Sequence, residues 1–146
     1  MPFVYRQKVL FQHCDPAGIV FYPRYMEMMN ATVEEWFATR LKHSFSMMHG
    51  AMQAGVPTAE LRVVFSAPSR LGEMLSVSLY LRRLGRSSAA LEFVADCEGQ
   101  VRLSMTSTLV FISFADGRPQ PWPDRLRRRM EAELEPTPAP EPDAQP

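Results

Sequence analysis

The chain has 146 residues, the length of one domain, and 46% of them are hydrophobic, which is enough to build a single core. Its 16 basic and 16 acidic residues cancel, which argues against a protein drawn by its overall charge to nucleic acid or to an anionic membrane. Any anionic ligand must therefore be held by a local cluster of basic side chains.

The N-terminal segment predicts a short strand and then a polar loop. Residues 3–11 alternate imperfectly between apolar and polar side chains, a pattern that suits a strand. Residues 12–18, Gln-His-Cys-Asp-Pro-Ala-Gly, combine Asp-Pro with a glycine. These residue types let a backbone turn sharply and approach a ligand closely.

A long amphipathic helix is predicted from Pro23, a favoured first helical residue because its missing N–H would have no acceptor within the helix. The helix covers roughly 18 residues. Its expected apolar face consists of Tyr22, Met26, Met29, Val33, Trp36 and Phe37, opposite Glu27, Asn30, Glu34, Glu35 and Ala38. A weaker helical stretch is expected between Ser44 and Ala54, where Met47, Met48 and Met52 would pack against a neighbour or a ligand.

Beyond Gly55 the hydrophobic pattern has a period of two, typical of strands. Strands are predicted over residues 61–66, closed by Ala67-Pro68, over 75–82, and over 91–97 after a turn at Gly85. Residues 101–114 predict a long strand whose last half is buried on both faces. After three prolines, Asp124 is expected to cap a surface helix that ends near residue 135.

The order of these elements predicts an α+β domain over residues 1–135. One helix followed by four mostly antiparallel strands is not βαβ alternation. The helix must bury a wide apolar face, and the concave face of a curved antiparallel sheet is the available surface, as in a hotdog fold. The last eleven residues, PTPAPEPDAQP, contain five prolines, so residues 136–146 are predicted to be a disordered tail.

The segment His-Cys-Asp-Pro-Ala-Gly-Ile-Val-Phe-Tyr-Pro-Arg-Tyr at residues 13–25 resembles the signature of the 4-hydroxybenzoyl-CoA thioesterase family. Weaker agreement extends the resemblance over roughly residues 3 to 130. The resemblance implies a hotdog fold and hydrolysis of an acyl-CoA, either aromatic, such as 4-hydroxybenzoyl-CoA, or short to medium in length. It also implies a site between subunits, so a homodimer or a homotetramer built as a dimer of dimers is expected.

The family's catalytic aspartate matches Asp15, and its helix-entry tyrosine, whose backbone amide faces the thioester oxygen, matches Tyr22. Asp15 would attack the carbonyl or act as general base for water, while the Tyr22 amide would stabilise the oxyanion and Gly18 would permit close approach. Read from spacing alone, Asp15 is an Asp-Pro turn residue and Tyr22 a helix-boundary aromatic. Some relatives carry an aspartate where this chain has His13, which is either a proton-transfer partner of Asp15 or a structural histidine.

Coenzyme A carries phosphates, so the resemblance implies a basic cluster near the site. Arg82, Arg83 and Arg86, with Ser87 and Ser88, are candidates for holding a phosphate or the pantetheine group, and a solvated turn is the alternative. Arg127 to Arg129 are interpreted as the solvated face of a charged helix. Glu34 and Glu35 lie on the polar face of the long helix, where solvent or a subunit contact explains them. The acyl group stays open, because an aliphatic chain also fits the candidate contacts Phe21, Trp36, Met48 and Phe65.

No motif implies a metal or a redox cofactor, and Cys14 and Cys97 lack metal-ligand spacing. The N-terminus resembles neither a signal peptide nor a transit peptide, and no apolar run approaches the ~18 residues of a membrane span. We therefore expect a cytoplasmic protein with free thiols. Hydrolysis of acyl groups carried on acyl carrier protein, and acyl-CoA binding without turnover, are the competing functions.

Overall fold

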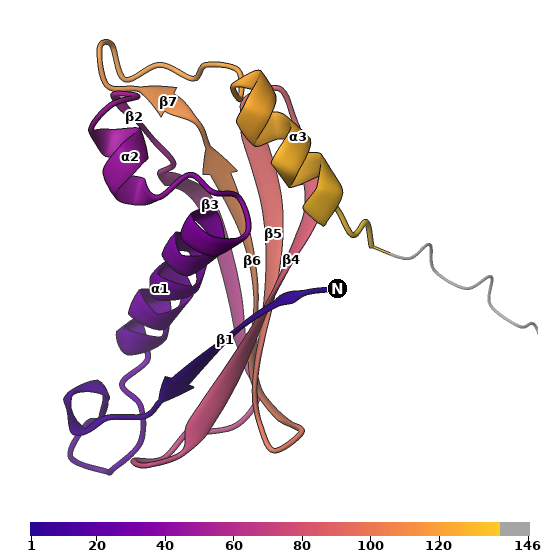
Figure 1. Cartoon of the computed structure of the whole chain (residues 1–146). Coiled ribbons are helices and arrows are strands. Elements are labelled where there is room, and N and C mark those ends of the chain that lie inside the picture. The colour runs from indigo at the N-terminus through magenta and orange to yellow at the C-terminus, as the bar shows by residue number, and fades with distance from the viewer. Residues whose placement is uncertain (138–146) are drawn as a thin grey trace, which may run out of the picture.

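The structure, a computed structural model, describes residues 1–137, so most of the predicted tail lies outside the described residues. Five antiparallel strands form one sheet, and a long helix, α1, lies along one of its faces (Figure 1). The strands in sheet order are β1 (Phe3–Lys8), β4 (Met74–Leu84), β5 (Ser88–Cys97), β6 (Gln100–Val110) and β3 (Thr58–Phe65). The other elements are η1 (Phe11–His13), α1 (Pro23–Thr39), α2 (Phe45–His49), β2 (Ala54–Gly55), β7 (Ile112–Ser113) and α3 (Asp124–Glu133).

The core follows the period-two pattern of the strands. The odd-numbered residues 75–81 of β4 and 89–97 of β5 are buried, while the even-numbered residues between them are partly exposed. The buried residues join those of α1 in one hydrophobic cluster. The predicted α+β arrangement, a hotdog with its helix packed against a curved antiparallel sheet, is confirmed.

Helix α1 begins at Pro23 as predicted, but its buried face differs from the expected one. Tyr22 is 63% exposed and precedes the first helical residue, and Met26 is only partly buried. The face against the sheet consists of Tyr25, Met28, Met29, Thr32, Val33, Trp36 and Phe37. The sheet, and not hydrophobicity alone, decides which side of the helix is covered. Glu34 and Glu35 are exposed, as expected.

The prediction that the last half of the 101–114 strand is buried on both faces was wrong. Within β6, Leu109 is buried, but Thr106 is exposed and Thr108 is only partly buried, because their side chains lie on the face away from α1. The chain then leaves the main sheet, since β7 pairs with β2 in a separate two-stranded sheet. Phe114 is 44% exposed.

The two minor helices are confirmed with changes. The expected helix between 44 and 54 is the five-residue α2, capped by the Ser44 hydroxyl, which accepts from the Met47 amide at 3.1 Å. Asp124 does not cap α3, because Pro123 holds the cap position and Asp124 is the first helical residue. No helix among residues 1–137 is both long and apolar enough to cross a membrane.

Candidate active site

The loop that leads into α1, residues 13–22, folds back on itself like a narrow hairpin, and we call it the entry loop. The Asp15 amide donates to the Ile19 carbonyl at 2.9 Å, and the Gly18 amide donates to the Asp15 carbonyl at 3.0 Å. Gly18 has φ +77°, a left-handed conformation that favours glycine. The predicted sharp turn is confirmed. Because the space beside Gly18 is open within the chain, the turn conformation is what requires glycine here.

Asp15 has one carboxylate oxygen in use and one available. Oδ1 accepts a hydrogen bond from the Ala17 amide at 2.9 Å, which is the turn contact expected from an Asp-Pro sequence. Within residues 1–137, Oδ2 has no hydrogen-bond partner, and the side chain is partly exposed. The turn role therefore leaves one oxygen able to attack a carbonyl or to accept a proton from water.

The backbone amide of Tyr22 is an unused donor at the start of α1. It makes no hydrogen bond within the described part of the chain, and Pro23, which follows it, has no N–H. The exposed Tyr22 ring lies between Phe21, with ring centroids 5.4 Å apart, and Phe65 of β3, 6.3 Å away. An unpaired amide at a helix N-terminus is a suitable donor for a developing oxyanion.

His13 is 6% exposed and bonds to its own loop. Its Nδ1 accepts from the Leu10 amide at 2.9 Å, so the ring proton belongs on Nε2. Its carbonyl accepts from the Phe21 amide at 2.9 Å. These two hydrogen bonds give His13 a structural role. No hydrogen bond joins His13 to Asp15 in residues 1–137, so proton transfer between them stays a prediction.

The predicted phosphate-binding residues lie at the opposite end of the sheet from the entry loop. Lys8, just before that loop, pairs with Met74 at one end of β4, and Leu84 lies at the other end. The 11 residues of β4 are separated by ten steps of ~3.3 Å, so its two ends lie roughly 33 Å apart. A single chain therefore does not bring Asp15 close to the β4–β5 turn that carries Arg83 and Arg86.

At that turn the structure joins two basic segments that the sequence separates. Arg83 and Arg86 are exposed, and Arg127 of α3 donates from Nη1 to the Gly85 carbonyl at 2.9 Å. The interpretation of Arg127 as merely solvated was wrong, because α3 packs beside the β4–β5 hairpin (Figure 1). The carbonyls of Ser87 and Ser88 accept from Phe111 and Trp122, which fixes the turn's backbone.

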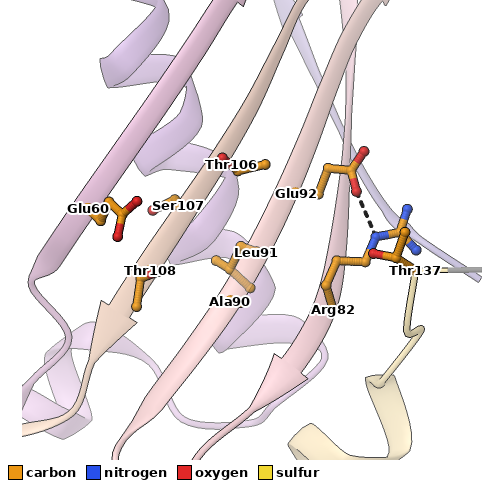
Figure 2. A pocket seen from close by; sticks show the side chains of 9 residues that line it. All are labelled: Glu60, Arg82, Ala90, Leu91, Glu92, Thr106, Ser107, Thr108 and Thr137. Carbon is orange, nitrogen blue, oxygen red and sulfur yellow. Dashed lines mark hydrogen bonds and ion pairs between the residues drawn. The ribbon is translucent and has the colours of Figure 1, made fainter.

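Arg82 is already paired on the sheet face away from α1. Figure 2 shows its guanidinium directed at Glu92. The distance from Arg82 Nε to Glu92 Oε2 is 2.8 Å, and both residues line a hollow of about 180 Å³. Its Nη1 also donates to the Glu135 carbonyl at 2.9 Å, and it stacks 4.3 Å from the Tyr80 ring centroid. Arg83 and Arg86 are thus the better placed of the predicted phosphate contacts.

Sequence analysis missed a cavity of about 190 Å³ between α1 and the β3 edge. It begins at Met26, one helical turn after Tyr22. Its lining is mostly apolar, with three neutral polar side chains: Asn30, Thr58 and Ser107. Trp36 and Met48, considered as acyl contacts, are instead core residues at 1% and 0% exposure.

A bidentate ion pair joins β6 to the end of the turn that bonds to the entry loop. Arg102 Nη1 and Nη2 each donate to a Glu73 carboxylate oxygen at 2.8 Å, and the Arg102 side chain is 8% exposed. These hydrogen bonds from Arg102, with one from the Arg70 amide, lower the pKa of Glu73 from 4.5 to about 2. Burial raises the pKa of the neighbouring Cys97 thiol.

The ion pair predicts an acid-sensitive stability. Because the pKa of Glu73 is lower in the folded chain, its contribution is complete above pH 4.5 and is lost as pH falls toward 2. Glu73→Gln should flatten the fall in the free energy of unfolding between pH 5 and 2, by no more than about 3 kcal/mol. Urea unfolding at several pH values measures this, and parallel curves for parent and variant would contradict it.

No group of three or more His, Cys, Asp or Glu side chains that could hold a metal ion occurs in residues 1–137. The expectation that no cofactor is needed stays a prediction. What the site offers chemically is a carboxylate oxygen and an amide donor in one short loop, a neutral cavity alongside α1, and a remote basic turn.

Comparison with known proteins gives a family and a set of related folds. The family described as Thioesterase-like superfamily matches residues 9–130. A gentisyl-coenzyme A thioesterase structure is 30% identical, with a TM-score of 0.77, covering 85% of this chain and 98% of that one. A 1,4-dihydroxy-2-naphthoyl-CoA thioesterase from Synechocystis is 18% identical, with a TM-score of 0.81, covering 89% of this chain and 96% of that one.

A hypothetical protein from Staphylococcus aureus, solved in complex with CoA, is 16% identical with a TM-score of 0.84, covering 97% of this chain and 90% of that one. A search of the curated proteins finds no match. At these identities, the Synechocystis and Staphylococcus structures support the fold alone.

Proposed function

Because this chain belongs to the thioesterase-like superfamily, we propose that it hydrolyses an acyl-CoA thioester to the free acid and coenzyme A. The observation that carries the proposal is the entry loop. Its Asp15 Oδ2 and its Tyr22 amide both lack hydrogen-bond partners among residues 1–137, and both lie in the ten residues that precede α1. A carboxylate and an unpaired amide donor are the two groups that thioester hydrolysis requires.

Two routes use the same two groups. In the first, an Asp15 oxygen bonds to the carbonyl carbon, the thiolate of coenzyme A leaves, and water cleaves the resulting mixed anhydride. In the second, Asp15 takes a proton from a water molecule that attacks the carbonyl directly. In both, the carbonyl oxygen becomes an oxyanion that the Tyr22 amide binds. In the first route the leaving thiolate takes up the proton that is released when water cleaves the anhydride, and in the second the proton that Asp15 took from water passes to the departing thiolate.

The cavity between α1 and β3 favours a hydroxylated aromatic acyl group, such as 4-hydroxybenzoyl, over an acyl group with a charge. An apolar cavity of about 150 Å³ holds a benzene ring in another protein, so about 190 Å³ is sufficient. Asn30, Thr58 and Ser107 offer partners for a ring hydroxyl without any charged group. The related structure named for gentisyl-CoA, at 30% identity, supports this choice.

We propose a homodimer through the β3 edge, with a homotetramer as a dimer of dimers. In β3, an unpaired edge of the sheet, Leu61, Val64 and Phe65 are 45%, 52% and 51% exposed. If two β3 edges pair antiparallel about a twofold axis, the Phe65 end of one chain, beside Tyr22, meets the Thr58 end of the other. Light scattering after size exclusion tests the stoichiometry, and a monomer would contradict it.

The function is tested by thiol release from a panel of aromatic, short-chain and long-chain acyl-CoAs. Turnover of any member supports hydrolysis and identifies the acyl class. If only acyl groups on acyl carrier protein react, the protein is an acyl-carrier-protein thioesterase instead of an acyl-CoA thioesterase. If acyl-CoA binds and nothing is hydrolysed, the chain is a binding module.

The cytoplasmic location of the protein also stays a prediction.

Asn30→Leu is expected to lower kcat/KM for a hydroxybenzoyl-CoA by about 10- to 100-fold, because the ring hydroxyl loses a partner on the cavity wall. The kcat/KM for benzoyl-CoA, which has no hydroxyl, should change by less than about threefold, so this substrate serves as the internal control. Parallel thiol-release assays with the two substrates measure the ratio. An equal loss for both would mean that Asn30 does not contact the hydroxyl.

A further inference from the structure

The turn between β3 and β4, residues 67–73, bonds directly to the entry loop. The Val20 amide donates to the Ser69 carbonyl at 2.9 Å, and the Leu71 amide donates to the Gly18 carbonyl at 3.3 Å. The two bonded positions in the loop lie between Asp15 and Tyr22. The position of this turn therefore fixes the position of the entry loop's returning half.

The same turn also holds the start of α1. The Tyr25 hydroxyl donates to Ser69 Oγ at 2.9 Å, and these two residues are 3% and 0% exposed. Tyr25 is in the first turn of the helix, three residues after Tyr22. A shift of the 67–73 turn would thus move both the loop that carries Asp15 and the helix start that carries the free amide.

Arg102 of β6 bonds to both ends of this turn. Besides its bidentate bonds to Glu73, its Nη1 donates to the Pro68 carbonyl at 2.8 Å. Across the turn, the Arg70 amide donates to Glu73 Oε1 at 2.5 Å. The Arg102 carbonyl accepts from the amides of residues 66 and 67 at 2.8 and 3.2 Å. Arg102 therefore anchors the turn to a strand of the main sheet, in addition to the Tyr25–Ser69 hydrogen bond and the backbone hydrogen bonds.

We propose that Glu73 and Arg102 are positioning residues of the reaction, which hold the 67–73 turn and through it set the relative placement of the Asp15 carboxylate and the Tyr22 amide. The inference rests on the proposed thioester hydrolysis. In this role neither residue needs to contact the substrate. A misplacement of about 1 Å is enough to cost roughly a hundredfold in rate, so an ion pair that holds the neighbouring turn can affect the chemistry.

Steady-state kinetics test the proposal with two variants and a matched control. Glu73→Gln removes the charge at nearly constant shape, and Arg102→Lys keeps the charge but loses the bidentate fork. Each should lower kcat by about 10- to 100-fold with KM within about threefold. The control Glu133→Gln breaks another ion pair, Arg40–Glu133 at 3.1 Å, at the far end of α1, and should stay within about twofold. A folded Glu73→Gln with parental kcat would overturn the proposal.

A double-variant cycle separates positioning from a general structural defect. If Glu73 acts through the entry loop, Glu73→Gln should lower the residual rate of the Asp15→Asn variant by clearly less than it lowers the parental rate, because only the placement of the Tyr22 amide is then still affected. If the loss from Glu73→Gln multiplies in full both with Asp15→Asn and with a variant that lacks the Tyr22 amide, Glu73 acts through neither group, and the proposal fails.

Amide hydrogen exchange gives a readout that needs no activity. In Glu73→Gln the Val20 amide, which bonds to Ser69, should exchange at least about tenfold faster, while β5 and β6 amides keep parental rates. Unchanged exchange at residues 18–21 would overturn the proposal. Should the parent hydrolyse no thioester, the proposed function fails, whereas the exchange result still decides whether the ion pair holds the loop.

Discussion

Replacing Asp15 by Asn is expected to lower kcat by about a thousandfold for whichever acyl-CoA the parent hydrolyses best, with the fold intact. The Asn side-chain oxygen can still accept the Ala17 amide that Asp15 Oδ1 accepts at 2.9 Å, so the turn should survive. The amide group cannot attack a carbonyl as a carboxylate does, and it cannot take a proton from water. General-base catalysis alone is worth roughly 10²–10⁴ in rate.

Asp116→Asn is the matched control for this experiment. Its Oδ1 accepts the Arg118 amide at 2.9 Å, the same contact two residues along the chain, in a turn after β7. This control should keep parental kcat and report any cost of the Asp-to-Asn change in a turn. Thiol-release kinetics with melting temperatures decide the outcome. If Asp15→Asn keeps more than about a tenth of parental activity, Asp15 is a turn residue and the proposed chemistry is wrong.

The elements predicted well are those whose signal is local. Helix α1 has a period near 3.6 and a proline at its first position, and β4 and β5 alternate cleanly, so both could be assigned from neighbouring residues. The helix face was displaced, with Tyr25 and Met28 buried where Tyr22 and Met26 were expected, because the sheet selects the covered side. The end of the 101–114 strand was predicted wrongly because the chain leaves the main sheet after β6 and pairs with β2 in a separate sheet.

In the candidate site, too, the local contacts could be predicted and the long-range contacts could not. The contacts of Asp15 with Ala17 and of Gly18 with Asp15 span two or three residues, so the turn was predictable from composition and the resemblance. Glu73 and Arg102 are 29 residues apart, and Arg127 meets Gly85 across 42. The cavity residues come from four elements: α1, β3, β5 and β6. Contacts of this kind depend on strand order, which no local pattern in the sequence encodes.

Removing the Tyr22 amide is the second decisive change, and the structure allows it without losing a hydrogen bond. Tyr22 has φ −52°, within the range of proline, and its N–H has no partner in residues 1–137. Tyr22→Pro should lower kcat by about 10²- to 10³-fold, the usual cost of one oxyanion donor. Tyr22→Ala keeps the amide and loses only an exposed ring, so it should stay within about fivefold of the parent.

The comparison of the two Tyr22 variants isolates the N–H group from the side chain. Proline also restricts Phe21 before it, so circular dichroism and melting temperature must show that Tyr22→Pro retains its fold. If it does not, an ester in place of the 21–22 peptide bond removes the same N–H with less disturbance and should show the same loss. If the folded proline variant or the ester matches Tyr22→Ala in kcat, the oxyanion is bound elsewhere. In that case, the unpaired amide at the start of α1 is a feature of the helix end and not of the reaction.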